Sequence, residues 1–347
     1  MGKPSLILAA LAADALPGLR FTSVLDLSVP GSEITSHLLS TDSGQLVMFK
    51  SPNSAIAMTE LGLEVRALRV LKNVDLPFKI PALLGETSVK AIRKALAFDY
   101  VLGNPVDFSR LKETDLLVGK LAQTIAKIHS IPAQLVIDAG LPEYDPALRV
   151  RERVAEFDRA METGRIPSAL LERWQNALLD VSLFRYQPSV VHGSLTGDCL
   201  LTDGTEVIGI NNWSNLCVDD PAVDLASLLA EANTAIADAL LLAYEGSIRA
   251  DRNLKQRANL YYELSFASYL LQAIAANDDE QIEEAIELLN QLNESLTQGV
   301  LPSLRPTELS PTNPEVITPI SQASSFTNPI PVITEQIETI ENPEIDK

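Results

Sequence analysis

The sequence is poor in the residues that most often mark a metal site or a disulfide. Its 347 residues include only two cysteines and three histidines. Cys199 and Cys217 are too far apart to form a Cys-x-x-Cys pair, and two cysteines make no disulfide framework. His37, His129 and His192 are scattered along the chain. We therefore expect neither a structural metal nor a disulfide.

Aromatic residues and positive charge are also scarce. Aromatics make up 5% of the chain, and 27 basic residues face 46 acidic ones, which gives a net charge of −19 and a pI of about 4.6. Such a chain lacks the basic surface that nucleic acid requires, and an anionic membrane would repel it. No apolar run reaches the length of a transmembrane helix. At long range the charge favours a cationic small molecule as ligand, although the simpler interpretation is that the acidity only keeps the protein in solution.

The first twenty residues have some features of a secretory signal. Lys3 precedes a short apolar run over residues 6–13, but Asp14 interrupts the run. The apolar side chains follow a helical spacing up to Pro17-Gly18, which ends helices. We therefore expect a packed N-terminal helix and a cytoplasmic protein.

The composition changes near residue 301. Residues 301–347 contain eight of the 21 prolines, no glycine, and a net charge of −5. Proline at this density forbids regular helix and is typical of disorder. The sequence thus predicts an N-lobe over residues 1–103, a helical lobe over 104–300, and a disordered acidic tail. The tail is either solvated or a contact for a protein partner.

The N-lobe pattern is that of strands interrupted by one helix. Residues 34–50 indicate a β-hairpin around an Asp-Ser-Gly turn, and residues 57–74 carry apolar side chains at helical spacing. Residues 94–103 read as a further strand that ends at a glycine. Strands, a helix and more strands predict an α+β lobe.

The larger lobe is predicted to be mostly helical. One helix starts at Thr114-Asp115, and residues 224–247 are apolar on most faces, which predicts one continuous buried helix. Residues 142–157 carry charges that we assign to a solvated helix face. Short strands are expected at 189–191, 200–202 and 207–210.

A sequence pattern typical of a catalytic loop lies among these strands. The stretch VVHGSLTGDCLL occupies residues 190–201, INNW follows at 210–213, and DDPAVDLA at 219–226. In this order and spacing the three stretches resemble the aminoglycoside and macrolide phosphotransferase family, in particular an actinobacterial branch of it. That family's signature is His-Gly-Asp-Leu-x-x-x-Asn-x-Leu, then Ile-Asp-Trp, then Gly-Asp-Pro-x-x-Asp-Leu-Ala. The resemblance implies a bilobal protein-kinase-like fold, ATP as cofactor and a small-molecule hydroxyl as substrate.

The resemblance also assigns the site residues. Lys50, which ends a strand, and Glu64 on the following helix match the pair that holds the nucleotide phosphates. Ser194 stands where the family has the aspartate that takes the substrate proton. Cys199 replaces the metal-binding asparagine, and Asn212 replaces the metal-binding aspartate of Ile-Asp-Trp. A hydroxyl is no base near neutral pH, and Mg²⁺ prefers oxygen ligands to thiols. Weak Mg²⁺ binding is therefore expected.

The other motif residues are assigned structural roles. His192 is expected to pack under the loop, Asp224 to brace it, and Asp220 to cap a helix. Asp198 and Asp219 are candidate substitutes for the missing carboxylates. The phosphate-binding loop contains a single glycine, Gly31, so few backbone amides would cradle a nucleotide.

Three hypotheses remain open at this point. The first is a catalytically impaired pseudokinase that still binds a nucleotide or another small ligand. The second is an active ATP-dependent O-phosphotransferase of the aminoglycoside or macrolide type, with displaced acidic residues. The third is an interaction scaffold that uses its acidic tail.

Overall fold

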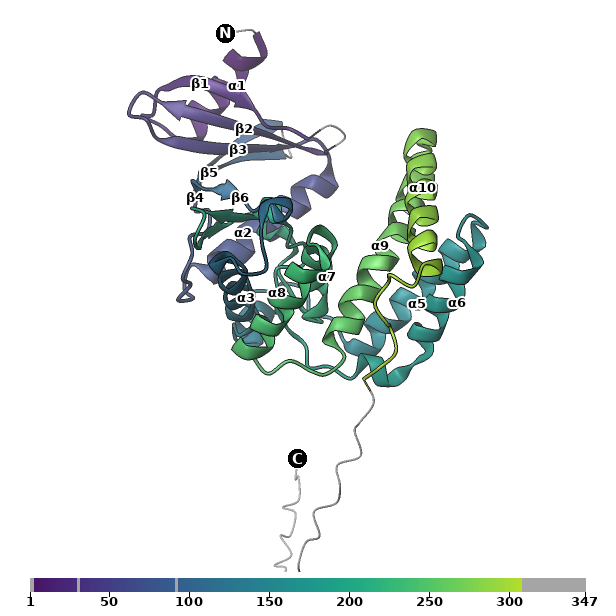
Figure 1. Ribbon diagram of the computed structural model, residues 1–347. Coiled ribbons are helices and arrows are strands. Elements are labelled where there is room, and N and C mark those ends of the chain that lie inside the picture. The colour runs from purple at the N-terminus through teal and green to yellow at the C-terminus, as the bar shows by residue number, and fades with distance from the viewer. Residues whose placement is uncertain (1–2, 30–31, 91–92, 308–347) are drawn as a thin grey trace, which may run out of the picture. The chain divides into compact units, whose positions relative to one another are not determined.

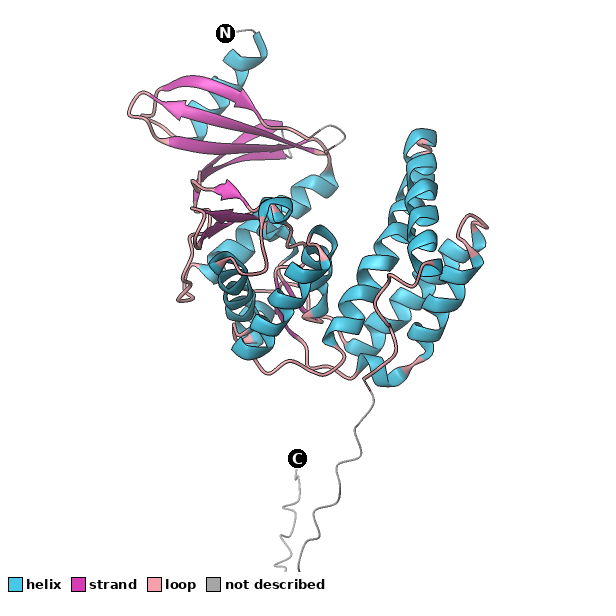
Figure 2. Ribbon diagram, viewed as in Figure 1, coloured by secondary structure: helices cyan, strands magenta, loops and turns pink. Residues whose placement is uncertain are grey.

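The computed structural model describes residues 3–29, 32–90 and 93–307 (Figure 1). Gly31 and most of the predicted tail, residues 308–347, lie outside the described residues. Within them, a β-rich N-terminal lobe is followed by a larger helical lobe (Figure 2). This arrangement confirms the predicted α+β, two-lobed architecture.

The N-lobe is built on one antiparallel sheet with the strand order β1-β2-β3-β5-β4. Its strands are β1 (Phe21–Asp26), β2 (Ile34–Thr41), β3 (Leu46–Pro52), β4 (Leu83–Lys90) and β5 (Arg93–Asp99). The predicted hairpin is the β2–β3 pair. Gly44 in its turn adopts a φ of +82°, a left-handed conformation that glycine adopts without steric cost.

The two faces of this sheet are covered by different helices. Side chains alternate along β3, so Val47 and Phe49 point to one face while Met48 and Lys50 point to the other. Helix α1 (Lys3–Ala15) packs on the first face, where Ala12 is fully buried. Helix α2 (Ala55–Leu71) lies on the second face. The alternation thus directs Lys50 towards α2.

The helical lobe holds eight α-helices within the described residues. They are α3 (Leu116–His129), α4 (Ala133–Asp138), α5 (Pro146–Glu162), α6 (Ser168–Leu179), α7 (Ala222–Glu231), α8 (Thr234–Ser247), α9 (Leu254–Ala276) and α10 (Asp279–Thr297). Helix α3 packs on α8, and α9 packs on α5, α7 and α10. Helix α3 begins after Asp115, as the sequence predicts.

The prediction of one buried helix over residues 224–247 was wrong. The segment contains two helices, α7 and α8, with extended backbone at Ala232. Asn233 starts the second helix, because its side chain accepts a hydrogen bond from the backbone N–H of Ile236 at 3.1 Å. The burial prediction also fails on α8, where Leu242 is 73% exposed.

Short strands carry the loop motif between these helices. The predicted strands are β7 (Ser189–Val191), β8 (Leu200–Thr202) and β9 (Val207–Ile210). The sequence missed β6 (Asn104–Pro105), which pairs with β8, and β10 (Cys217–Asp219), which pairs with β7. Four 3₁₀ helices complete the described elements: η1 (Phe108–Arg110), η2 (Val181–Phe184), η3 (Gly197–Cys199) and η4 (Trp213–Asn215).

The first residues assigned to the tail belong to the helical lobe. The carbonyl of Pro302 accepts a hydrogen bond from Arg173 at 2.6 Å, and Leu304 is buried. The backbone N–H of Thr307 donates to the side chain of Asn253 at 3.0 Å. The lobe therefore extends to residue 307 rather than ending at 300. None of the described helices has the length and apolar character needed to cross a membrane.

Candidate functional site

Lys50 and Glu64 form an ion pair between the sheet and α2. The Nζ atom of Lys50 lies 2.8 Å from both carboxylate oxygens of Glu64. The Glu64 side chain is 3% exposed and that of Lys50 is 16% exposed. Ser54 fixes the start of α2 by accepting a hydrogen bond from the N–H of Ala57. The sheet and the helix thus hold this cation in one place.

Asp224 braces the loop that follows β7. Its two oxygens accept hydrogen bonds from the backbone N–H groups of His192 and Gly193, both at 2.8 Å, and Nε2 of His129 lies 3.2 Å from Oδ2. Gly193 has a φ of +84°, and a Cβ there would lie 2.3 Å from the carbonyl oxygen of Asn215. A fully buried carboxylate and an obligatory glycine therefore set the shape of the loop.

Burial, hydrogen bonds and neighbouring charges shift the pKa values of Asp224 and His192. Burial alone would raise the pKa of Asp224, but the hydrogen bond and charge of His129, with smaller contributions from His192, outweigh it and lower that pKa. Burial lowers the pKa of His192, although Asp224 acts in the opposite direction. His192 is therefore neutral near pH 7, and its Nε2–H donates to the carbonyl of Asn211 at 2.9 Å.

The lowered pKa of His192 predicts a pH-dependent stability. Since the folded chain binds this proton less readily than the unfolded chain, stability falls as the pH drops below the ordinary value of 6.5. The slope approaches about 1.4 kcal/mol per pH unit. Urea unfolding at about pH 7.5 and at about pH 5.5 should show the loss. His192→Gln keeps a donor for Asn211 and should flatten the slope; an unchanged slope would contradict the prediction.

The three replaced positions lie together at the loop. The buried Cys199 donates its S–H to the carbonyl oxygen of Ser194, with Sγ and oxygen 3.6 Å apart. The amide Nδ2 of Asn212 lies 3.7 Å from the same sulfur. Asn212 has a φ of 62°, in the left-handed region, where Asn and Asp occur more readily than other non-glycine residues. Cys199 and Asn212 thus contact each other.

This arrangement does not fit Mg²⁺. The two residues that the resemblance assigns to metal-binding positions carry a thiol and an amide, neither of them a carboxylate, and Nδ2 of the amide contacts the sulfur. Among residues 3–29, 32–90 and 93–307 there is no cluster of three or more His, Cys, Asp or Glu side chains suited to a metal ion. Ser194 is half-buried, carries no charge and cannot supply the missing carboxylate.

The candidate substitute carboxylates are placed differently from one another. Asp198 is exposed on η3. Asp219 is buried in β10, where Nε and Nη2 of Arg149 lie 2.9 and 2.8 Å from its Oδ2. Asp220 is fully buried and accepts bonds from Arg257, from the hydroxyl of Tyr261 and from the N–H of Ala222. The predicted cap is not formed as expected, because Pro221 is the N-cap residue of α7; Asp220 lies just before it, binds the N–H of Ala222 and anchors a buried arginine.

Sequence reasoning missed Glu231 at the end of α7. Its carboxylate accepts a hydrogen bond from the N–H of Gly197 at 3.1 Å, so α7 touches the loop at both ends. Burial raises the pKa of Glu231, and the charge of Asp198 adds to this effect. The spacing of seven residues from Asp224 places both on one face of the helix, a signal that the sequence carried.

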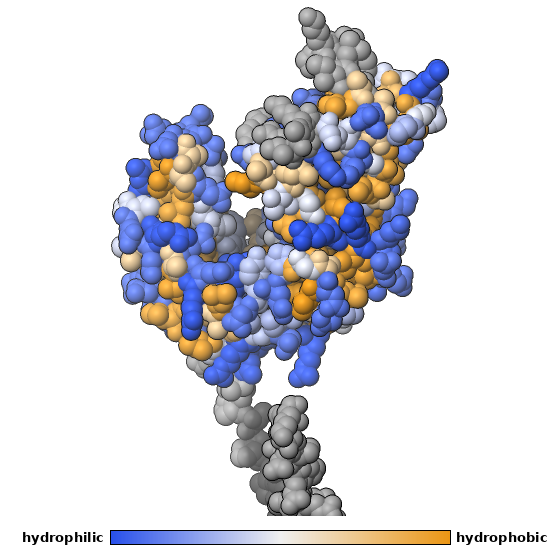
Figure 3. All heavy atoms as spheres, turned by 180° about the vertical axis from the view of Figure 1, so that it is seen from behind, coloured by the Kyte–Doolittle hydropathy of each residue, from blue (hydrophilic) through white to orange (hydrophobic). Residues whose placement is uncertain are grey.

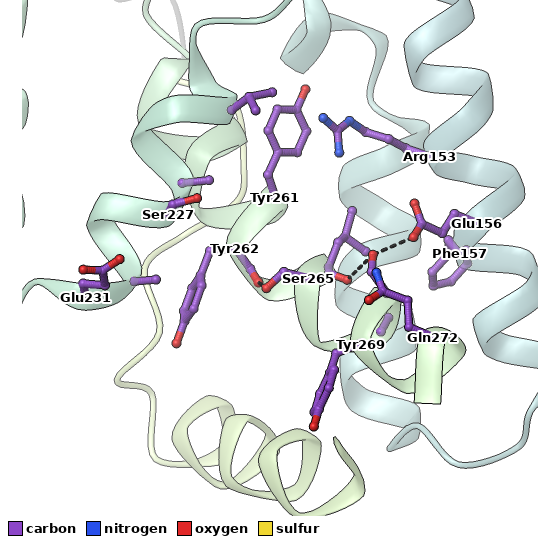
Figure 4. A pocket seen from close by; sticks show the side chains of 16 residues that line it. Arg153, Glu156, Phe157, Ser227, Glu231, Tyr261, Tyr262, Ser265, Tyr269 and Gln272 are labelled. Carbon is purple, nitrogen blue, oxygen red and sulfur yellow. Dashed lines mark hydrogen bonds between the residues drawn. The ribbon is translucent and has the colours of Figure 1, made fainter. Parts of the chain in front are cut away.

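A cavity of about 570 Å³ opens beside Glu231, between α5, α7 and α9. Figure 3, viewed from behind, shows the surface hollowed between the side that carries α9 and α10 and the rest of the described chain. Tyr261, Tyr262 and Tyr269 of α9 line the cavity, with Arg153 and Glu156 of α5 opposite them (Figure 4). A cavity of this size holds a small organic molecule.

Comparisons with known proteins agree with this geometry. A family model described as the phosphotransferase enzyme family matches residues 31–261. A type I macrolide 2'-phosphotransferase is 24% identical with a TM-score of 0.71, over 83% of this chain and 98% of that one. A macrolide 2'-phosphotransferase from Brachybacterium faecium is 22% identical with a TM-score of 0.70, over 82% and 98%.

The structure of APH(2″)-IIIa with GDP and kanamycin is 20% identical with a TM-score of 0.71, over 84% of this chain and 99% of that one. A comparison with curated proteins found no match. The structural likenesses confirm the predicted kinase-like fold.

Proposed function

Because this chain belongs to the phosphotransferase enzyme family, we propose that it keeps that family's nucleotide site but has lost phosphoryl transfer. The observation that carries the proposal is the contact between the replaced side chains Cys199 and Asn212, next to Ser194. Nucleotide binding depends on the lysine that contacts the phosphates, whereas phosphoryl transfer also needs the base and the metal ligands. The chain can therefore keep nucleotide binding after it has lost transfer.

The loss of transfer follows from the chemistry of these three positions. A positioned base contributes about 10²–10⁴-fold to a proton-transfer step, and Ser194 has no useful basicity. The metal supplies charge that neutralises the phosphate oxygens in the transition state. Cys199 and Asn212 offer no negative charge to hold it, since the thiol is a donor to the Ser194 carbonyl.

The retained nucleotide site is supported by Lys50 and Glu64. A lysine on a strand, held by a helix carboxylate at 2.8 Å, is the arrangement that kinases use for the α- and β-phosphates. A buried carboxylate at this place is costly unless it has a partner. We infer that ATP occupies this site and that its phosphates contact Lys50. We also propose a cytoplasmic location, which is compatible with the packing of Ala12 on α1 into the core of the N-lobe.

Thermal unfolding with ATP tests the proposal. We expect ATP to stabilise the chain without any divalent metal, by about 2.7 kcal/mol at a hundred times its Kd. Lys50→Met should remove the shift, while Lys72→Met, at the exposed end of α2, should keep it. The absence of any shift would contradict nucleotide binding. A shift that requires Mg²⁺, together with consumption of ATP on an aminoglycoside or macrolide, would instead indicate an active phosphotransferase.

A further inference from the structure

Arg153 differs from the other inward-facing arginines of the helical lobe. Arg149 pairs with Asp219, Arg173 pairs with Glu263, and Arg257 pairs with both Asp220 and Asp251. Each of these guanidinium groups thus has a carboxylate within 3 Å.

Arg153 has no carboxylate within 4 Å among the residues that the structure describes, and its buried Nε lacks a hydrogen-bond partner there. Its guanidinium lies over the ring of Tyr261, 3.6 Å from the ring centroid. It lines the cavity between α5, α7 and α9 (Figure 4). The cavity therefore contains a cation that the described part of the chain does not neutralise.

The carboxylates of the cavity, by contrast, have partners. Glu156 accepts a hydrogen bond from the hydroxyl of Ser268 at 2.5 Å, and Glu231 accepts the N–H of Gly197. These two groups lie on different helices, and Figure 4 shows Glu231 on the far side of the cavity from Arg153. An unpaired positive charge thus stands at one end.

We propose that this cavity binds a small arylalkyl carboxylate, whose carboxylate pairs with Arg153. A guanidinium binds a carboxylate through two parallel hydrogen bonds, and the terminal nitrogens of Arg153, which lines the cavity, would donate them. The aromatic body lies against the rings of Tyr261 and Tyr262 and the small side chains of α7, such as Ala226 and Ala230. A dianionic phosphate is disfavoured, because Glu156 and Glu231 share the cavity.

The proposal goes beyond nucleotide binding and does not depend on it. Lys50 belongs to the N-lobe sheet, whereas the cavity lies between helices of the helical lobe. It also departs from the cationic ligand that the net charge of −19 favours at long range. The selectivity for an anionic ligand would come from its direct contact with the guanidinium of Arg153, and not from the net charge of the protein.

Isothermal titration of the full chain with three matched probes tests it. The probes are 3-phenylpropionate, its neutral amide 3-phenylpropanamide and the cation 3-phenylpropylamine, with phenyl phosphate as a fourth. We expect the acid to bind about tenfold or more tightly than the amide, and the amine and the phosphate to bind most weakly, since one charged hydrogen bond accounts for that ratio. Equal binding of acid and amide, preference for the amine, or no binding of the acid at millimolar concentration would overturn the proposal. Tighter binding of the phosphate than of the acid would also overturn it.

Two variants assign the effect to the cavity. Arg153→Gln should bring the affinities of acid and amide within about twofold of each other, because the charged contact is gone. Arg151→Gln, exposed on the same helix, is the matched control and should leave the preference intact. Survival of the acid preference in Arg153→Gln would contradict the proposal. Thermal stabilisation by ATP, measured on the same variants, shows that they are folded and that their nucleotide site is intact. The nucleotide proposal is thus tested by the ATP shift, and the cavity proposal by the ratio of acid to amide affinity.

Discussion

Replacing Arg257 with methionine is expected to lower the free energy of unfolding by about 3–5 kcal/mol. Its guanidinium is fully buried and holds Asp220 at 2.6 and 3.0 Å and Asp251 at 2.7 and 2.8 Å, with the carbonyl oxygen of Leu183 at 3.1 Å. Methionine fills similar space but leaves Asp220 charged in the interior with only neutral donors. Since domains are stable by about 5–15 kcal/mol, the loss is a large fraction of the total.

Urea unfolding of the variant and of a matched control measures this loss. Arg252→Met changes the same residue type near the start of α9 at an exposed position, and should stay within about 0.5 kcal/mol of the wild type. Adding Asp220→Asn and Asp251→Asn to Arg257→Met removes the orphaned charges and should recover part of the stability. If Arg257→Met loses no more unfolding free energy than Arg252→Met, the ion pairs of Arg257 do not stabilise the fold as expected.

The second large effect is expected from restoring the family's side chains. The triple variant Ser194→Asp, Cys199→Asn, Asn212→Asp should make ATP binding depend on Mg²⁺, with affinity about tenfold or more higher when the metal is present, which is about 1.4 kcal/mol. The backbone permits this change, because Asn212 has a φ of 62° and aspartate tolerates the left-handed region. The substitutions remove the contact between Cys199 and Asn212 and put an amide and a carboxylate, both with oxygen atoms that can bind the metal, in their places.

Titration of ATP with and without Mg²⁺ is the measurement, on the triple variant and on each single variant. Ser194→Asp alone restores only the base position and should not create metal dependence. Asn212→Asp alone should give a smaller effect than the triple variant, because the thiol of Cys199 still occupies the neighbouring ligand position. A triple variant whose affinity for ATP is the same with and without Mg²⁺ would mean that other parts of the site have diverged as well.

Local patterns predicted much of the fold because each rested on short-range physics. The β2–β3 hairpin follows from its Asp-Ser-Gly turn. Asp115 is the N-cap residue of α3, although its side chain binds the N–H of Lys112 instead of an N–H of the helix. The break between α7 and α8 escaped because Asn233 sits inside an apolar run, and one capping side chain competes there with a strong helical pattern. Strand β10 was missed because its partner, β7, lies far away in the sequence and no hairpin turn marks the pair.

Long-range contacts explain what the sequence concealed about the site. The charges of residues 142–157 were assigned to a solvated face, yet Arg149 reaches buried Asp219 and Arg153 lines the cavity. A periodicity argument places the polar residues of a helix on its solvent-exposed face. It does not show that Arg149 has a buried partner, Asp219, 70 residues later in the sequence. Lys50 and Glu64 were paired correctly in space because the strand and the next helix lie close in sequence.

The brace made by Asp224 separates the shape of the loop from its chemistry. The carboxylate holds backbone N–H groups of His192 and Gly193, which every residue except proline possesses, while the side chains of Ser194, Cys199 and Asn212 take no part in it. Substitutions at those three positions therefore leave the loop's main support untouched. The loop is in this sense robust, because its side chains can diverge while its backbone stays folded.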